Sequence, residues 1–298
     1  MDNICVRNNI ITFKDNFNND LDDKYYDIIK NSNINTIHFN DYFKGNILNL
    51  PDNITCIKFS KNVVFNGKLV LPSKLEILIM PSKYNYKLIF PDTLKLLIIY
   101  EYNYDLDNLP SDLHELRLLG DNNVKINMFP INLKKLILGI GYKQKIDIFP
   151  EGLQVFIDTY NYNYPIDNFP NSLINVVFGS KFQQDINLLP DSIKYLTLNC
   201  DYTKKINKYP NNLEELIIDG DNFYDRSSGI ITIDFNILPQ SIKKIKFDSR
   251  CAYNIINVEN INNLVNLEKI ITYDGRNYQL IKDILIDKNK IILNKTKY

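Results

Sequence analysis

The sequence predicts a β-rich solenoid with an α/β-like layout, in which coils of about 20 residues stack in line and each adds one short strand to a parallel sheet. Three observations carry this prediction: a regularly spaced proline, apolar residues at fixed distances after it, and a two-residue spacing within that apolar set. The prolines are 19 to 21 residues apart, with one final interval of 29 residues. The series consists of Pro51, Pro72, Pro91, Pro110, Pro130, Pro150, Pro170, Pro190, Pro210 and Pro239.

Each coil repeats apolar residues three, six and eight positions after its proline. In the coil that starts at Pro130 they are Leu133, Leu136 and Leu138. Positions six and eight are two residues apart, so their side chains share one face of a strand and are expected to point inward. Asp158 is the one polar residue at position eight. Because a single coil cannot bury its own apolar face, the coils must stack, and successive strands then pair in parallel.

The proline marks the corner of each coil. It fixes φ and lacks an amide hydrogen, so it suits the turn that leads into a strand and cannot sit in a central strand. Two further inward positions follow the strand in several coils, an aromatic residue at position twelve and an isoleucine at position sixteen. They are Tyr84, Tyr142, Tyr162, Phe182 and Tyr202, and Ile126, Ile146, Ile166, Ile186 and Ile206.

The two ends of the chain depart from the repeat and are expected to cap the stack, because a solenoid must cover its open ends. This gives three predicted segments: an N-terminal cap at 1–30, the repeats at 31–250 and a C-terminal cap at 251–298. Within the last segment, the sequence KDILIDKNKIIL predicts a β-hairpin that turns at DKNK.

One helix is predicted in the N-terminal segment. Leu21, Tyr25 and Ile28 are spaced as on a single helical face. Asn19 or Asp20 stands where a helix N-cap is expected, since short polar side chains accept hydrogen bonds from the first amides of a helix.

Composition narrows the class of protein. The 35 basic and 35 acidic side chains give a formal net charge of zero, so the surplus of positive charge typical of nucleic-acid or anionic-membrane binding is missing. The start has no basic stretch followed by an apolar one, and no run of about 18 apolar residues occurs, so neither a secretion signal nor a membrane span is expected. The four cysteines are too widely spaced for a disulfide framework or a metal-binding pair. We expect a reduced, cytoplasmic protein without cofactor or metal.

Few residues could support catalysis. His38 and His114 are the only histidines, and both are expected at the surface. No nucleophile elbow, phosphate-binding loop or metalloprotease helix is present. A β-helix enzyme acting on polysaccharide would gather carboxylates on the sheet, but Glu115 and Glu215 lie far apart. The sequence therefore favours a protein that is not an enzyme.

The final, longer proline interval contains a polar segment at 219–229, which predicts a surface insertion. Asp219, Asp221 and Asp225 are spaced somewhat as in a calcium-binding loop, so a cation site is the alternative. The glycine and terminal glutamate of that loop are not in the required places.

The outward positions of the predicted strands carry more apolar residues than a solvated sheet face normally does. Apolar patches of this extent usually contact a protein, so a partner protein or a second copy in a homodimer is expected there. High β-propensity of these residues is the competing explanation. The predicted binding residues are Ile77, Ile79, Leu96, Ile98, Tyr100, Arg117, Ile137 and Ile157.

The segment FGSKFQQDINLLPDSI at 178–193 resembles the FNIP repeat, a relative of the leucine-rich repeat found in slime moulds and giant amoebal viruses, and FNILP at 235–239 is similar to it. The resemblance extends over 31–250, although most coils have Tyr, Lys or Asn in place of the Phe-Asn part. It implies a leucine-rich-repeat-type solenoid that binds a protein partner, a host protein in the host cytoplasm if the chain is viral. Some members of the family carry an F-box, so the alternative is a substrate-recruiting subunit of a ubiquitin ligase acting through the N-terminal segment. Residues 1–30 are too few for that three-helix module.

Overall fold

The computed structural model describes residues 4–13, 17, 20–21, 23–63, 65–220, 230–248, 251, 253–273 and 275–293. The chain forms two compact units, residues 1–144 and 145–298. Each unit is a stack of coils of about 20 residues with one short strand per coil, so the predicted solenoid is confirmed. The predicted division into segments 1–30, 31–250 and 251–298 stays a prediction.

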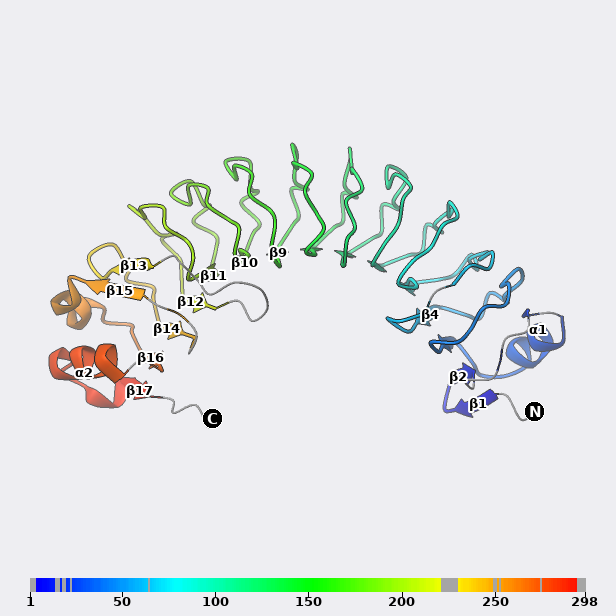
Figure 1. The fold of residues 1–298 in the computed structure, drawn as a ribbon, viewed down its shortest axis with the longest axis horizontal. Helices are drawn as coiled ribbons and strands as arrows, with labels where there is room; N and C mark the ends of the chain where they lie inside the picture. Colours follow the sequence, from blue (N-terminus) through cyan, green and yellow to red (C-terminus); the bar gives the residue numbers. More distant parts are fainter. Residues whose placement is uncertain are drawn as a thin grey trace. The chain divides into compact units, whose positions relative to one another are not determined.

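The first unit contains one mainly parallel sheet, with its strands in chain order from β1 to β8. Only β1 and β2 pair antiparallel, and β2 to β8 pair in parallel. Each coil has its strand on one side and its turns on the other (Figure 1). The strands are β1 (Ile4–Arg7), β2 (Ile10–Phe13), β3 (Thr36–Phe39), β4 (Cys56–Phe59), β5 (Ile77–Ile79), β6 (Leu96–Ile99), β7 (Glu115–Leu118) and β8 (Lys135–Leu138), and helix α1 (Asp23–Lys30) connects β2 with β3.

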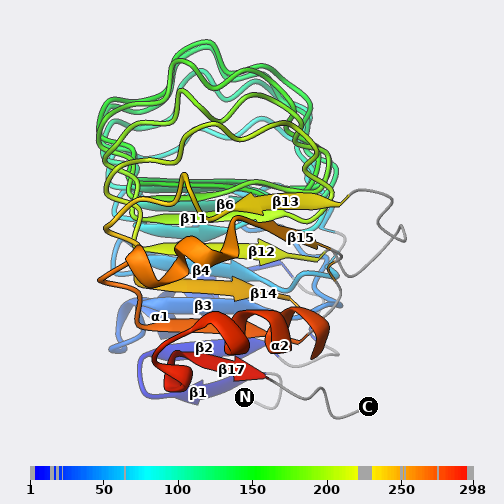
Figure 2. The same cartoon turned by 90° about the vertical axis from the view of Figure 1, so that its left-hand side faces the viewer.

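In the second unit, seven strands form a parallel sheet, and two further strands, β13 and β15, pair in parallel beside it. Strands β11, β12, β14 and β17 point the same way (Figure 2). The strands are β9 (Val155–Asp158), β10 (Asn175–Val177), β11 (Tyr195–Asn199), β12 (Glu215–Asp219), β13 (Ile231–Asp234), β14 (Lys244–Phe247), β15 (Tyr253–Ile256), β16 (Lys269–Thr272) and β17 (Ile291–Leu293). The helical segments are the 3-10 helices η1 (Val258–Asn263) and η2 (Lys288–Lys290) and the α-helix α2 (Gly275–Ile284).

The prolines form the corners of the coils, as predicted. The carbonyl oxygen of each proline in the series accepts a hydrogen bond from the amide three residues later, at 3.0–3.2 Å. The coil then continues into its strand, and the carbonyl at position four accepts two amides from the next coil. The amides of Lys134 and Lys135, for example, donate to the carbonyl of His114 at 2.9 and 3.0 Å. Proline therefore stands where no amide is needed, and the position-four carbonyl links neighbouring coils.

The predicted inward residues form the core of both units. Position six pairs with position six of the next coil, as Leu116 does with Leu136, so the register follows the prolines. The residues predicted at positions three, six, eight, twelve and sixteen are buried throughout the series. Stacking each coil on the next thus removes a face from water that no coil could bury alone.

The N-terminal segment differs from the prediction in two respects. Strands β1 and β2 form a hairpin that the sequence does not predict. The hairpin turns at Asn8, which has φ 53°. Helix α1 is present, but it buries Ile29, and Ile28 is only half-buried. Asp20 does not cap the helix, because its carboxylate accepts the amide of Asn46 at 2.6 Å. Asn19 lies outside the described residues.

The predicted C-terminal hairpin is wrong. Strand β17 pairs in parallel with β16, and α2 and η2 form the crossover between them. A parallel pair requires such a crossover, whereas a hairpin would be antiparallel. Ile281 and Leu285 are buried and four residues apart, which is the spacing of one helical face. The alternation in KDILI was mistaken for a strand because it is too short to distinguish the two periods.

Candidate protein-binding face

The outward side chains of the first unit's strands lie in register across neighbouring coils. Ile79 on β5 is opposite Ile98 on β6, Ile98 is opposite Arg117 on β7, and Arg117 is opposite Ile137 on β8. A second row runs through Ile77 and Leu96, and Tyr100 directly follows β6. The structure therefore brings together seven of the eight predicted binding residues. We call them the apolar strip: Ile77, Ile79, Leu96, Ile98, Tyr100, Arg117 and Ile137.

The exposure of the apolar strip is moderate. Six of its residues are half-buried, and Ile98 is buried, with 8% of its surface exposed. The neighbouring rows on β5 and β7 cover the middle of the strip, because adjacent strands of a sheet are only about 5 Å apart. A partner would thus contact mainly the rims of the strip, at Ile79 and Ile137.

The charge of Arg117, within the strip, is paired with charges beside it. The carboxylate of Glu115 accepts the Nε–H of Arg117 at 2.6 Å and lies 3.1 Å from the Nζ of Lys135. All three side chains are only partly exposed. Two cations share one carboxylate here, so the cluster keeps one positive charge next to the apolar residues of the strip.

Ile157, the eighth predicted residue, belongs to the second unit. On β9 it lies opposite Val177 of β10, and the row continues through Thr197 on β11 to Ile217 on β12. All four are half-buried. The carboxyl ends of these strands border a hollow of about 240 Å³. Its lining includes Ile157, Val177, Thr197, Asp158, Ser180, Asn199 and Asp219.

Asp158, the polar exception at position eight, is 1% exposed and points into the second unit. Its Oδ1 accepts the amides of Tyr160 and Tyr162 at 3.1 and 3.2 Å, and its Oδ2 accepts the amide of Gly179 at 3.1 Å. Burial raises the pKa of the carboxyl to about 6, against the opposing effect of these amides. The sequence marked this position as irregular, but it gave no sign that backbone amides would surround the carboxylate.

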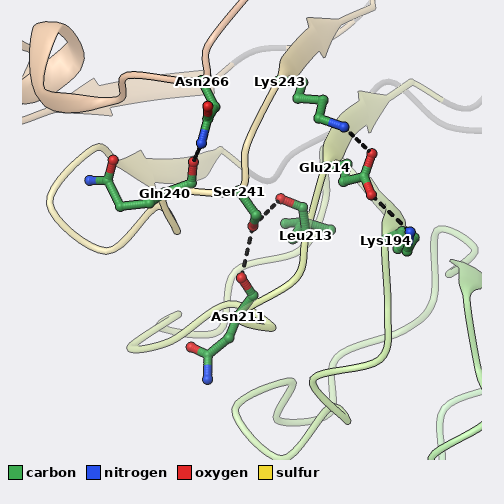
Figure 3. A network of polar contacts seen from close by, with 8 residues as sticks. All are labelled: Lys194, Asn211, Leu213, Glu214, Gln240, Ser241, Lys243 and Asn266. Carbon is green, nitrogen blue, oxygen red and sulfur yellow. Dashed lines mark hydrogen bonds and ion pairs between the residues drawn. The ribbon is translucent and has the colours of Figure 1, made fainter.

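The turn edge of the second unit carries an ion-pair row across three coils. Glu214 lies between Lys243, at 2.7 Å, and Lys194, at 3.0 Å (Figure 3). The hydrogen bonds from these two lysines, of which that from Lys243 has the larger effect, hold the pKa of Glu214 below its ordinary value. Exposed pairs of this kind contribute little to stability.

A serine joins neighbouring coils at the same edge. The hydroxyl of Ser241 donates to the carbonyls of Leu213 and Asn211, at 2.7 and 2.8 Å (Figure 3). Ser172 makes the equivalent bond to the carbonyl of Leu153 at 2.6 Å. These serines stand two residues after a proline, so in these two coils the Pro-x-Ser turn links the coil to the previous one.

The residues considered for catalysis or metal binding are dispersed. His114 is exposed, as expected, but His38 is half-buried, so the surface prediction is wrong for it; burial, and then Lys58, lowers the pKa of His38. Of the possible cation loop only Asp219 is described, and Asp221 and Asp225 lie outside the described residues. In the described part of the chain, no three His, Cys, Asp or Glu side chains are grouped to hold a metal ion. No described helix has the length and apolar character needed to cross a membrane.

Comparison with known proteins agrees with this architecture. Residues 160–201 match the FNIP repeat family model. The crystal structure of CroV588, described as a novel circular LRR protein structure from a giant virus, is similar at 28% identity with a TM-score of 0.61. The match covers 90% of this chain and 41% of that one, so the chain spans less than half the length of that protein. No protein in the curated set matches the sequence. The chain thus carries FNIP repeat sequence at 160–201 and is similar in fold to a leucine-rich-repeat protein of a giant virus.

Proposed function

We propose that the protein is a non-enzymatic interaction scaffold that binds a partner protein on the outward face of its parallel sheet. The observation that carries the proposal is the apolar strip on β5–β8, where Ile79, Ile98 and Ile137 lie in one row, with Arg117 between the last two, on a face that should be mainly polar if it met only water. The described helix of the first unit, α1, connects β2 with β3 and does not cover these strands.

The chemistry of the face fits a protein better than a small molecule. The strip is long and shallow, and its residues are half-buried, whereas small ligands are held in deep pockets. Apolar residues next to a charge cluster are typical of a protein interface with an apolar centre and a polar rim. The similarity to a leucine-rich-repeat protein supports the same class of function.

The partner is a host protein if the chain is viral, or a second copy of the chain. We place the protein in the cytoplasm, because its free cysteines fit a reducing compartment. The ubiquitin-ligase alternative has less support, because the N-terminal segment is engaged within its own unit: β2 pairs with β3, and Ile29 of α1 is buried.

The test compares two substitutions in one coil. Ile137→Glu changes the strip, and Ile131→Glu changes a side chain of the same coil that is 76% exposed and lies outside the sheet. The tagged protein is used to isolate partners from cells, and the affinity of each purified partner, or of self-association, is then measured for both variants. Ile137→Glu is expected to weaken binding at least about tenfold, and Ile131→Glu is expected to leave it unchanged. Equal affinity of the two variants would overturn the proposal.

A further inference from the structure

Two cysteines far apart in the sequence meet in the second unit. Cys200 directly follows β11, is 1% exposed, and donates its amide to the carbonyl of Asp219 at 2.9 Å. Cys251 lies three residues after Asp248, to whose carbonyl it donates its amide at 3.3 Å, and its Sγ lies 3.6 Å from the carbonyl oxygen of Ile218. Both cysteines thus pack at the end of β12, and their thiol groups are hydrogen-bonded to each other.

We propose that Cys200 and Cys251 are a disulfide-forming pair, which a low-molecular-weight disulfide such as oxidised glutathione converts into an intramolecular cross-link. The four cysteines differ in whether a second thiol lies next to them. Cys5 is exposed on β1 and Cys56 is buried on β4, and both belong to the first unit. Only the second unit therefore offers two thiols in contact.

The difference in exposure sets the order of the two exchange steps. Cys251 is half-buried, so an oxidant can reach it, whereas Cys200 is enclosed. The Cys251 thiolate attacks one sulfur of oxidised glutathione, the glutathione S–S bond breaks, and one glutathione thiolate leaves. The Cys200 thiolate then attacks the Cys251 sulfur of the mixed disulfide and releases the second glutathione. The two cysteine protons end on the two glutathione thiols, and two electrons pass from the cysteines to glutathione.

The surroundings slow the reaction of the pair with an oxidant. The hydrogen bond with Cys200, which favours the protonated Cys251 thiol, raises the pKa of Cys251; burial raises it further, and the charges of Cys200, Asp248 and Asp219 act in the same direction. Because the thiolate is the reacting form, exchange is slow at neutral pH and accelerates as the pH rises. Once formed, the cross-link joins the end of β11 to the segment that follows β14 and encloses residues 201–250.

The experiment uses the full-length chain with Cys5→Ser, which removes the exposed cysteine that could link two copies. The reduced protein is treated with excess oxidised glutathione, quenched by alkylation and analysed by intact mass and by peptide mapping without reduction. We expect the loss of two hydrogen atoms, one peptide containing Cys200 linked to Cys251, and an unmodified Cys56. In the Cys200→Ala variant one glutathione should remain on Cys251, because no second thiol can displace it, and Cys251→Ser should give neither product.

The proposal is overturned if the protein with both cysteines retains a stable glutathione adduct, forms no cross-link, or links either cysteine to Cys56 instead. If Cys200→Ala fails to fold, as judged by circular dichroism, Cys251→Ser and the peptide map of the protein with both cysteines decide the question alone. A mixed disulfide on Cys200 in Cys251→Ser would contradict the proposed order of attack.

Discussion

The carboxylate of Asp158 and the amide of Gly179, residues of successive coils, are joined by a hydrogen bond of 3.1 Å. The same carboxylate accepts the amides of Tyr160 and Tyr162 in its own coil. A polar residue thus occupies a core position because backbone amides surround its carboxylate, and the position joins two coils through hydrogen bonds where the other coils use apolar contact.

This arrangement predicts an unusual dependence of stability on pH. The pKa of Asp158 in the folded protein is raised from the ordinary 3.8 to about 6, first of all by burial. A raised pKa means that folding favours the protonated form, so the contribution of Asp158 is largest below pH 3.8 and is lost as the pH rises through about 6. The difference between these two pKa values corresponds to ~3 kcal/mol of folding free energy. The measurement is urea unfolding of the unaltered protein and of Asp158→Asn at pH 4, 5, 6 and 7. Between pH 4 and 7 the free energy of unfolding of the unaltered protein should fall by about that amount relative to that of Asp158→Asn. A difference that stays constant with pH would contradict the raised pKa of Asp158.

Gly179 is predicted to be indispensable for a different reason. A Cβ atom there would overlap the backbone nitrogen of Tyr160 and lie 2.6 Å from its Cα, and backbone atoms cannot move aside as a flexible side chain can. Gly179→Ala should therefore lower the free energy of unfolding by about 1–3 kcal/mol. Thr159 holds the same position in the preceding coil and is exposed, so Thr159→Ala should stay within about 0.5 kcal/mol. Thermal unfolding of the two variants checks this, and equal melting temperatures would show that the coils are less closely packed here.

The serine of the Pro-x-Ser turn allows a comparison between two coils. Ser241→Ala removes a hydroxyl that donates to the carbonyls of Leu213 and Asn211, so it should cost about 1–2 kcal/mol. The buried hydroxyl of Ser192 has no hydrogen-bond partner among the described residues, so Ser192→Ala should be neutral or slightly stabilising. Chemical denaturation of both variants provides the measurement. A loss of stability in Ser192→Ala as large as in Ser241→Ala would mean that both hydroxyls are bonded.

The repeat could be predicted from the sequence because every coil supplies independent evidence for the same register. The prolines and the apolar residues at position six agree in each coil, so an error in one coil is corrected by the others. The ends lack this redundancy. A few residues such as KDILI fit either a strand or a helix, and the choice depends on whether β17 pairs with β16 in parallel, which local periodicity does not determine.

The sequence predicts which side chains of the candidate face point outward, but it predicts less well how exposed they are. Strand alternation shows that Ile98 points outward, but its burial depends on the neighbouring rows at Ile79 and Arg117, which come from other coils. The contact between Cys200 and Cys251 could not be predicted either, because Cys251 begins the segment 251–298, which departs from the repeat. Contacts made by segments outside the repeat can be identified only once the three-dimensional arrangement of the coils is known.

The register itself can be tested at Leu136. Its side chain is fully buried on β8, opposite Leu116 of β7, and both belong to the row that every coil contributes to the core. Leu136→Ala should lower the free energy of unfolding by about 2–5 kcal/mol, because it removes buried apolar surface and leaves a cavity that the neighbouring coils cannot close. Ile131→Ala in the same coil changes a side chain that is 76% exposed and should cost less than about 0.5 kcal/mol. The two variants are compared by urea unfolding followed by circular dichroism. Because each coil contacts only its neighbours, the loss at Leu136 should also make unfolding less cooperative. If Leu136→Ala unfolds at the same urea concentration as Ile131→Ala, position six does not face the core.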